Sequence, residues 1–204
     1  LSAVVGYIEL LEQGLGDPDL EQDLVVRTRR ELDRIHRIIQ ALLNYARSAP
    51  GAAVSVTVAP LLEEAVSIVQ MRPDCRDVTF GVTVPDDLAK IRVEPDKLHQ
   101  VLVNLLINAS HAVLEQPVRR VDLIASPAGD DVEISCIDTG PGFTAVALER
   151  ALEPFFTTKP VGQGIGLGLA TCQTIIDAFG GSLTPENRTE GGAVVRIRLP
   201  VESA

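Results

Sequence analysis

A run of glycines at alternate positions is the segment of this chain best suited to bind phosphate. It reads Gly162-Gln163-Gly164-Ile165-Gly166-Leu167-Gly168 and is followed by the apolar pair Leu169-Ala170. Glycine is costly inside a helix or strand because it loses backbone entropy and offers no side chain for packing. Unhindered backbone N–H groups leading into a helix form an anion site, because the amides and the helix dipole both favour negative charge. A glycine-rich structural turn is the alternative interpretation, and this segment alone does not separate the two.

The overall charge and the spacing of residues exclude several other functions. The net charge of −10 argues against broad nucleic-acid binding, which needs a basic surface. No three of the glycines match the dinucleotide fingerprint GxGxxG, and the loop GxxxxGK[ST] occurs nowhere in the chain. The three cysteines, Cys75, Cys136 and Cys172, include no CxxC pair, so we expect reduced thiols and no zinc site.

Two asparagines four residues apart indicate a place for a magnesium ion. The spacing of apolar residues predicts a helix over 97–115, with Asp96 as its N-cap after Pro95. At about 100° per residue, one stripe roughly 60° wide lies away from the apolar face and carries Lys97, Asn104, Asn108, His111 and Glu115. Amide oxygens four apart can converge on a hard cation that also holds phosphate oxygens. A solvated polar face is the alternative, although asparagine is a poor helix former.

A carboxylate follows the predicted strand 132–137 and is the candidate for binding a nucleobase. Asp138 stands at the end of this alternating segment, and Gly140 and Gly142 come just after it. The carboxylate can accept a hydrogen bond from an adenine amino group, and the glycines leave room for a flat base against the backbone. The same residues could also form a simple turn.

The order of these segments resembles the N, G1, F and G2 boxes of bacterial sensor histidine kinases. The four matching segments are Asn-Leu-Leu-Ile-Asn-Ala (104–109), Asp-Thr-Gly-Pro-Gly (138–142), Glu-Pro-Phe-Phe-Thr-Thr-Lys-Pro (153–160) and Gly-Gln-Gly-Ile-Gly-Leu-Gly-Leu-Ala (162–170). The wider superfamily includes gyrase-type topoisomerases and mismatch-repair ATPases. Four boxes in this order and spacing make a chance match improbable.

The resemblance implies a role for each matching residue. Asn108 would bind Mg²⁺ with Asn104 in support, Asp138 would anchor adenine, and Gly140 and Gly142 would shape the base pocket. His111 would lie near the phosphates, although a plain helix-surface histidine is an equal alternative. Residues 144–161 would form a mobile lid, with Phe155 and Phe156 as its apolar latch and Lys159 within reach of a phosphate. The remaining implied nucleotide contacts are Thr158, Gly162, Gly164, Gly166, Leu167, Gly168 and Leu169.

The sequence departs from the family pattern at one glycine-loop position. Many relatives have threonine or serine where this chain has Ile165. A hydroxyl contact from that position is therefore absent, whereas backbone amides can still bind phosphate. Nucleotide affinity or lid geometry is expected to differ from that of relatives with the hydroxyl.

The first fifty residues have the pattern of a helical hairpin. Apolar residues follow a three-four spacing in two runs, separated by Gly14, Gly16, Asp17 and Pro18: Leu1, Val4, Ile8, Leu11 and Leu15, then Leu32, Ile35, Ile39, Leu42 and Ala46. Two such hairpins would make a four-helix bundle, as in the family's dimerisation and phosphotransfer domain. The family's phosphorylated histidine would lie upstream of Leu1, and His36 is interpreted as a residue at the edge of the seam. The 204-residue chain is therefore not expected to phosphorylate itself.

The fold class we expect is α+β, with the helical hairpin followed by an α/β sandwich of one mixed sheet and helices on one face. The hairpin would occupy 1–47, a linker 48–53 and the ATP-binding domain 54–204. Strands are expected at 54–58, 78–84, 91–93, 121–125, 132–137, 182–184 and 194–199, and further helices at 61–70, 145–152 and 167–179.

The function implied by the resemblance is that of an ATP-dependent protein-histidine kinase in a two-component system. It would bind Mg²⁺ and ATP, transfer the γ-phosphoryl group to a histidine, and pass it to an aspartate of a response regulator receiver domain. We expect a homodimer formed through the hairpin, no nucleic-acid partner, and a cytoplasmic location with membrane attachment only through segments outside this sequence. The alternatives are a non-catalytic adaptor of the same fold and a serine kinase that regulates sigma factors.

Overall fold

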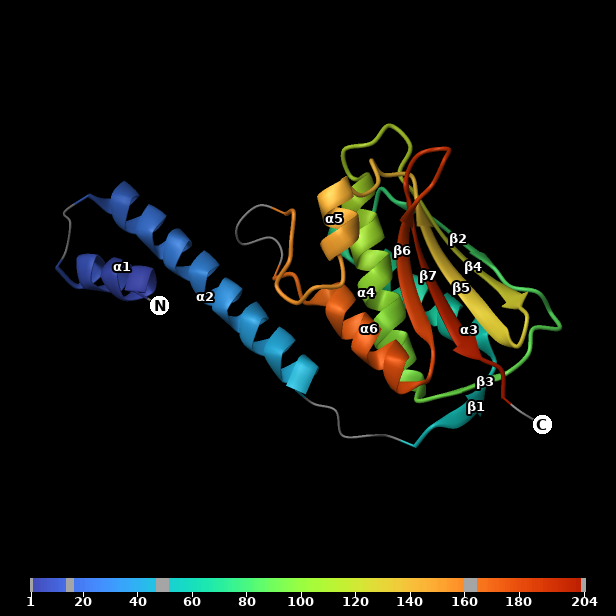
Figure 1. Ribbon diagram of the computed structural model, residues 1–204. Coiled ribbons are helices and arrows are strands. Elements are labelled where there is room, and N and C mark those ends of the chain that lie inside the picture. The colour runs from blue at the N-terminus through green and yellow to red at the C-terminus, as the bar shows by residue number, and fades with distance from the viewer. Residues whose placement is uncertain (1, 14–16, 47–51, 160–164, 203–204) are drawn as a thin grey trace. The chain divides into compact units, whose positions relative to one another are not determined.

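The structure is a computed structural model that describes residues 2–13, 17–46, 52–159 and 165–202 (Figure 1). The chain divides into two compact units. The first comprises Leu1–Ala49 with Lys159–Ile165, and the second comprises Pro50–Thr158 with Gly166–Ala204. None of the described helices is long and apolar enough to cross a membrane.

Two helices in contact with each other make up most of the first unit. They are α1 (Ser2–Gln13) and α2 (Pro18–Ala46). Asp17 caps the N-terminus of α2, because its carboxylate accepts hydrogen bonds from the backbone N–H groups of Asp19 at 3.0 Å and Leu20 at 3.4 Å. The expected turn residues Gly14 and Gly16 and most of the expected linker lie outside the described residues. The four-helix bundle stays a prediction.

A five-stranded mixed sheet forms the centre of the second unit. Its strand order is β2-β4-β5-β7-β6, where β2 (Thr79–Thr83) is parallel to β4 (Arg120–Ala128) and the other neighbours are antiparallel. The remaining strands are β5 (Asp131–Asp138), β6 (Ser182–Asn187) and β7 (Ala193–Pro200). A separate antiparallel pair joins β1 (Val54–Val56) to β3 (Ile91–Val93). This architecture confirms the expected α+β class.

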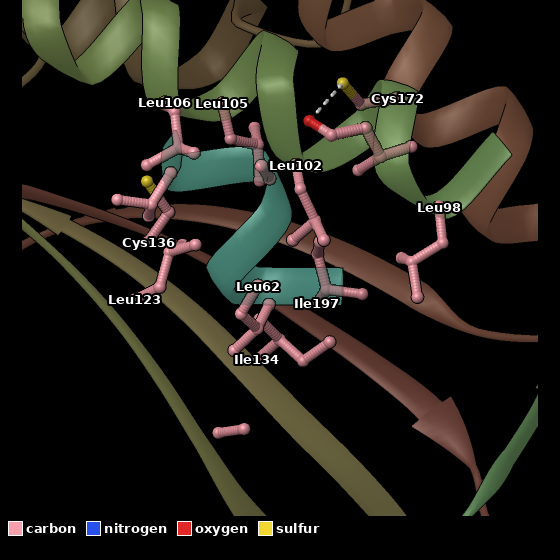
Figure 2. Packing of buried hydrophobic residues seen from close by; sticks show 14 of the residues in the cluster. Leu62, Leu98, Leu102, Leu105, Leu106, Leu123, Ile134, Cys136, Cys172 and Ile197 are labelled. Atoms are coloured by element: carbon pink, nitrogen blue, oxygen red, sulfur yellow. Dashed lines mark hydrogen bonds between the residues drawn. The ribbon is translucent and has the colours of Figure 1, made fainter. Parts of the chain in front are cut away.

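Helices cover one face of the sheet, as Figure 1 shows. They are α3 (Val58–Gln70), α4 (Pro95–Val113) and α6 (Gly168–Ala178), with the short elements η1 (Pro73–Cys75) and α5 (Ala145–Arg150) beside them. The core lies between these helices and the inward residues of the strands, where α4 supplies Leu98, Leu102, Leu105 and Leu106 against Leu123, Ile134 and Ile197 (Figure 2). Burial of this apolar face holds α4 in place and leaves its polar stripe for other contacts.

Several expected boundaries differ from the observed ones by two or three residues, and local reasons explain two of them. The strand expected at 54–58 ends at Val56, because Val58 is buried as the first residue of α3, and Pro60 is tolerated in the first turn of that helix. The N-cap of α4 is Glu94 and not Asp96, since Pro95 occupies the first helical turn. The short element η1 was not expected.

Candidate functional site

Asp138 ends β5 as a buried carboxylate held by two backbone amides. Its Oδ1 accepts a hydrogen bond from the N–H of Gly140 at 2.8 Å and from the N–H of Ala193 at 3.2 Å. Both bonds end on the same oxygen, so Oδ2 is left to accept a bond from a ligand. Burial raises the pKa of Asp138 above its ordinary value, and the two amides and Arg188 offset that effect only in part. This geometry suits an acceptor for a single amino group.

Gly140 brings the loop after β5 against α4. A Cβ atom at this position would lie 2.8 Å from Oδ1 of Asp138 and 3.0 Å from the carbonyl oxygen of Ala112. No other residue fits that space without moving the carboxylate or the helix. The close approach expected of this glycine is therefore present, between the acid and the helix.

The two asparagines of α4 are half-buried and lie beside the start of α6. A Cβ atom on Gly168, the first residue of α6, would be 3.3 Å from Nδ2 of Asn108. The thiol of Cys172, also in α6, donates to the carbonyl of Val101 at 3.8 Å, the dashed line of Figure 2. Burial raises the pKa of this thiol, and the side chain of Asn104 is near enough to offset that rise in part. The asparagine stripe and the glycine segment, about sixty residues apart in sequence, therefore meet at one place.

A single turn of α4 joins the two halves of this site. Ala112 faces the loop after Asp138, and Asn108, one turn earlier, faces the first residue of α6. One helical turn is about 5.4 Å long. A purine at Asp138 and a phosphate chain at the start of α6 would thus lie at neighbouring positions along one helix.

Phe155 and Gly166 join the lid segment to the glycine segment through their backbones. The N–H of Phe155 donates to the carbonyl of Gly166 at 2.8 Å, and both residues have positive φ, of 68° and 72°. A Cβ on Gly166 would lie 2.5 Å from the carbonyl carbon of Phe155 and the carbonyl oxygen of Phe156. Phe155 as a residue is 63% exposed, whereas the guanidinium of Arg150 lies over the ring of Phe156 at 4.6 Å. In this structure the backbone of Phe155, rather than its ring, makes the contact.

His111 faces a carboxylate from a different part of the chain, that of Asp74. Its Nε2 is 3.3 Å from Oδ2 of Asp74 in η1, and Arg72 binds the same carboxylate through two bonds of 2.9 and 3.1 Å. Arg72 first, and His111 after it, hold the pKa of Asp74 well below its usual range. The predicted closeness of His111 to phosphate stays a prediction, and Asp74 is a partner that only the fold revealed.

For the other residues expected to contact the nucleotide, the structure supports such a contact less directly. Leu167 is buried and the side chain of Leu169 packs on the core, so either would touch a ligand only through its backbone. Thr158 is exposed, Lys159 lies in the first unit, and Gly162 and Gly164 lie outside the described residues. Roles for these four residues stay predictions.

The side-chain amides of α4 are of the chemical type that a magnesium ion shared with a ligand uses. In the described part of the chain, no cluster of three or more His, Cys, Asp or Glu residues could hold a metal by itself. Asn104 and Asn108 offer hard oxygen donors without a carboxylate, and Mg²⁺ commonly completes its shell with waters and substrate phosphates.

The three cysteines are buried and form no disulfide. Burial raises the pKa of Cys172 to about 12, which keeps it a thiol.

Comparison with known families identifies the group to which this site belongs. The model of the histidine kinase-, DNA gyrase B- and HSP90-like ATPases matches residues 93–203, which include α4, Asp138 and the glycine segment. The chain belongs to this ATPase family. The match begins just before α4 and ends just after β7, so it covers all the elements that form the site.

The relatives of this ATPase domain are sensor kinases. The C4-dicarboxylate transport sensor protein DctB of Pseudomonas aeruginosa is 43% identical over 167 residues, which are 81% of this chain and 27% of DctB. Full-length ShkA, solved in complex with AMPPNP, is 27% identical with a TM-score of 0.70, and the match covers 90% of this chain and 39% of ShkA. The histidine kinase ThkA, solved with its response regulator TrrA, shares the fold with a TM-score of 0.75 at 24% identity, over 98% of this chain and 57% of ThkA. The chain therefore contains the histidine kinase type of ATPase domain and spans about a quarter of the length of DctB.

Proposed function

We propose that this chain binds Mg²⁺-ATP and is the catalytic part of a protein-histidine kinase in a two-component system. One observation carries the proposal: a single turn of α4 contacts both parts of the site. Ala112 lies against the loop after Asp138, and Asn108 lies against Gly168. The proposal is supported by the family match and by ShkA, a relative whose structure was solved with AMPPNP.

Each part of the site has a distinct task in this proposal. Oδ2 of Asp138 accepts the amino group of adenine, while Gly140 keeps the loop thin enough for the base to lie against it. The N–H groups at the start of α6 bind phosphate oxygens, and Asn108 with Asn104 offers oxygen atoms to Mg²⁺, which neutralises phosphate charge. Phosphoryl transfer depends mainly on such positioning and charge neutralisation. The backbone contact between Phe155 and Gly166 ties the lid segment to the phosphate site.

Replacement of Asn108 by alanine tests the magnesium assignment. Wild-type chain should bind ATP more tightly with Mg²⁺ than with EDTA, and Asn108→Ala should lose about 10- to 100-fold of affinity in Mg²⁺ only. Isothermal titration calorimetry in both buffers measures this difference. Glu115→Ala, at an exposed site two residues beyond α4, is the control and should bind as the wild type does. An equal loss in Mg²⁺ and EDTA would remove the metal role from Asn108, and no heat from the wild type would favour the adaptor alternative.

Phosphoryl transfer is proposed to end on a histidine of the dimerisation domain and then on a response regulator. The fold shared with ThkA, which was solved with TrrA, supports a receiver domain as the partner. The sequence contains three histidines, His36, His99 and His111, and none of them is followed by the acidic residue that follows the phosphorylated histidine in the family which this chain resembles. We expect no acid-labile phosphate on the purified chain after incubation with [γ-³²P]ATP. Radiolabel on any of the three histidines would contradict this.

The helices of the first unit are proposed to form a homodimer. Ile8 of α1 and Leu32 of α2 belong to the expected apolar seam, yet they are 42% and 50% exposed in the single chain. Apolar residues at heptad-like spacing that stay exposed in one copy favour burial against a second copy.

A further inference from the structure

The turn between β6 and β7 is hydrogen-bonded to the loop that follows Asp138. The side-chain amide of Asn187, the last residue of β6, makes two bonds to the backbone of Phe143. Its Oδ1 accepts from the N–H of Phe143 at 2.7 Å, and its Nδ2 donates to the carbonyl of Phe143 at 2.8 Å. An asparagine that satisfies both backbone groups of one residue fixes that residue in position and orientation.

The contact between this turn and the loop is also tight. A Cβ atom on Gly142, which has φ of +78°, would lie 2.7 Å from Oδ1 of Asn187. On the other side of the turn, a Cβ on Gly192 would overlap the carbonyl oxygen of Asp138, and the next N–H, of Ala193, donates to the Asp138 carboxylate. The hairpin 187–193 therefore touches the acid at one end and the glycine loop at the other.

We propose that Asn187 is a positioning residue for the nucleobase, an inference that rests on the proposed ATP-binding function. Asp138 and the loop 140–143 must keep a fixed separation for a flat base to lie on the backbone while its amino group meets Oδ2. The hairpin sets this separation, because Ala193 holds the acid and Asn187 holds the loop. Asn187 itself acts through Phe143 and does not need to touch the base.

Base discrimination distinguishes this role from simple support of the fold. ATP and ITP share ribose and phosphates and differ at the edge of the purine that would face Asp138: ATP has an amino group on C6 and an acceptor at N1, whereas ITP has an oxygen on C6 and a hydrogen on N1. Loss of the two hydrogen bonds between Asn187 and Phe143 should weaken only the part of ATP affinity that depends on the alignment of the base with Asp138. Loss of general stability would affect both nucleotides equally.

The test is calorimetry of Asn187→Ala and Asn187→Asp with Mg²⁺-ATP and Mg²⁺-ITP. We expect each variant to lose about tenfold in ATP affinity with ITP affinity unchanged, so that the preference for ATP largely disappears. Asn187→Asp keeps the shape and the acceptor for Phe143 N–H but loses the donor, which provides a folded variant if the alanine variant is unstable. Thr184→Ala, exposed on the same strand, is the control and should keep the wild-type preference.

The outcomes separate the inference from the function on which it rests. A wild type that binds neither nucleotide would overturn the proposed ATP-binding function. A wild type that prefers ATP, together with Asn187 variants that keep this preference or lose affinity for both nucleotides equally, would overturn the positioning role alone.

Discussion

Replacement of Asp138 by asparagine should lower ATP affinity about 100-fold. The side-chain oxygen of asparagine can still accept the N–H groups of Gly140 and Ala193, which now bind Oδ1. The NH₂ group would then occupy the place of Oδ2 and present a donor to the amino group of adenine. Two facing donors lose the hydrogen bond and leave a buried polar group unpaired, and 100-fold corresponds to about 2.7 kcal/mol. Calorimetry with Mg²⁺-ATP measures the loss, and unchanged affinity would contradict the adenine assignment.

The same substitution should not destabilise the protein at neutral pH. Burial raises the folded-state pKa of Asp138 above its ordinary value of 3.8, so the fold favours the protonated acid. The stability contributed by Asp138 is therefore present below the unfolded pKa of about 4 and is lost as the pH rises through the raised folded pKa. Asp138→Asn stays neutral throughout, so its unfolding free energy at pH 7 should equal or exceed that of the wild type. Urea unfolding at pH 7 and pH 4 tests this. The excess of the variant's unfolding free energy over that of the wild type should be smaller at pH 4 than at pH 7.

Replacement of Gly166 by alanine should abolish most nucleotide binding through a different cause. Gly166 has a φ of 72°, and a methyl group there would meet backbone atoms of Phe155 and Phe156 at 2.5 Å. Backbone cannot rotate aside as a side chain can, so the lid segment and the glycine segment must separate. We expect ATP affinity to fall about 100-fold, since displacement of positioning groups by about 1 Å has effects of this size on catalysis.

Gly129→Ala is the matched control for this prediction. Gly129 lies in the turn between β4 and β5, also has a positive φ of 69°, and would place its Cβ in open space. Alanine there adds the backbone strain of about 1 kcal/mol without the clash. We expect reduced stability with unchanged ATP affinity. If Gly166→Ala bound ATP as tightly as Gly129→Ala does, the contact with Phe155 and Phe156 would not matter for the site.

The regular elements were predictable because their patterns are local. Leu98, Leu102, Leu105 and Leu106 recur at helical spacing, and burial of just this face orients the asparagines of α4. The alternation in 132–137 likewise predicted β5 and the position of Asp138 at its end. Errors occurred where one residue decides a boundary, as Pro95 does by beginning α4 one residue before Asp96.

The partners of the site residues were not predictable from the same patterns. Asp74 meets His111 across 37 positions and Asn187 meets Phe143 across 44, and neither pair shares a periodic signal. The glycine pair Gly191-Gly192 before β7 is a local indication of a close approach in the sequence. It gave no information about which backbone would be approached, which is the carbonyl of Asp138.

The sequence by itself determined the classes of group available for chemistry: an acid at a strand end, amides on a helix face and glycines before a helix. It did so because residue type and spacing fix which side chains share a face and where backbone can be approached. Only the tertiary structure decided that one turn of α4 joins the acid to the glycine segment and that the 187–193 hairpin holds the loop beside Asp138. Those contacts depend on the strand order β5-β7-β6 and on the packing of α4 against α6, which the chain reaches only by burying its core.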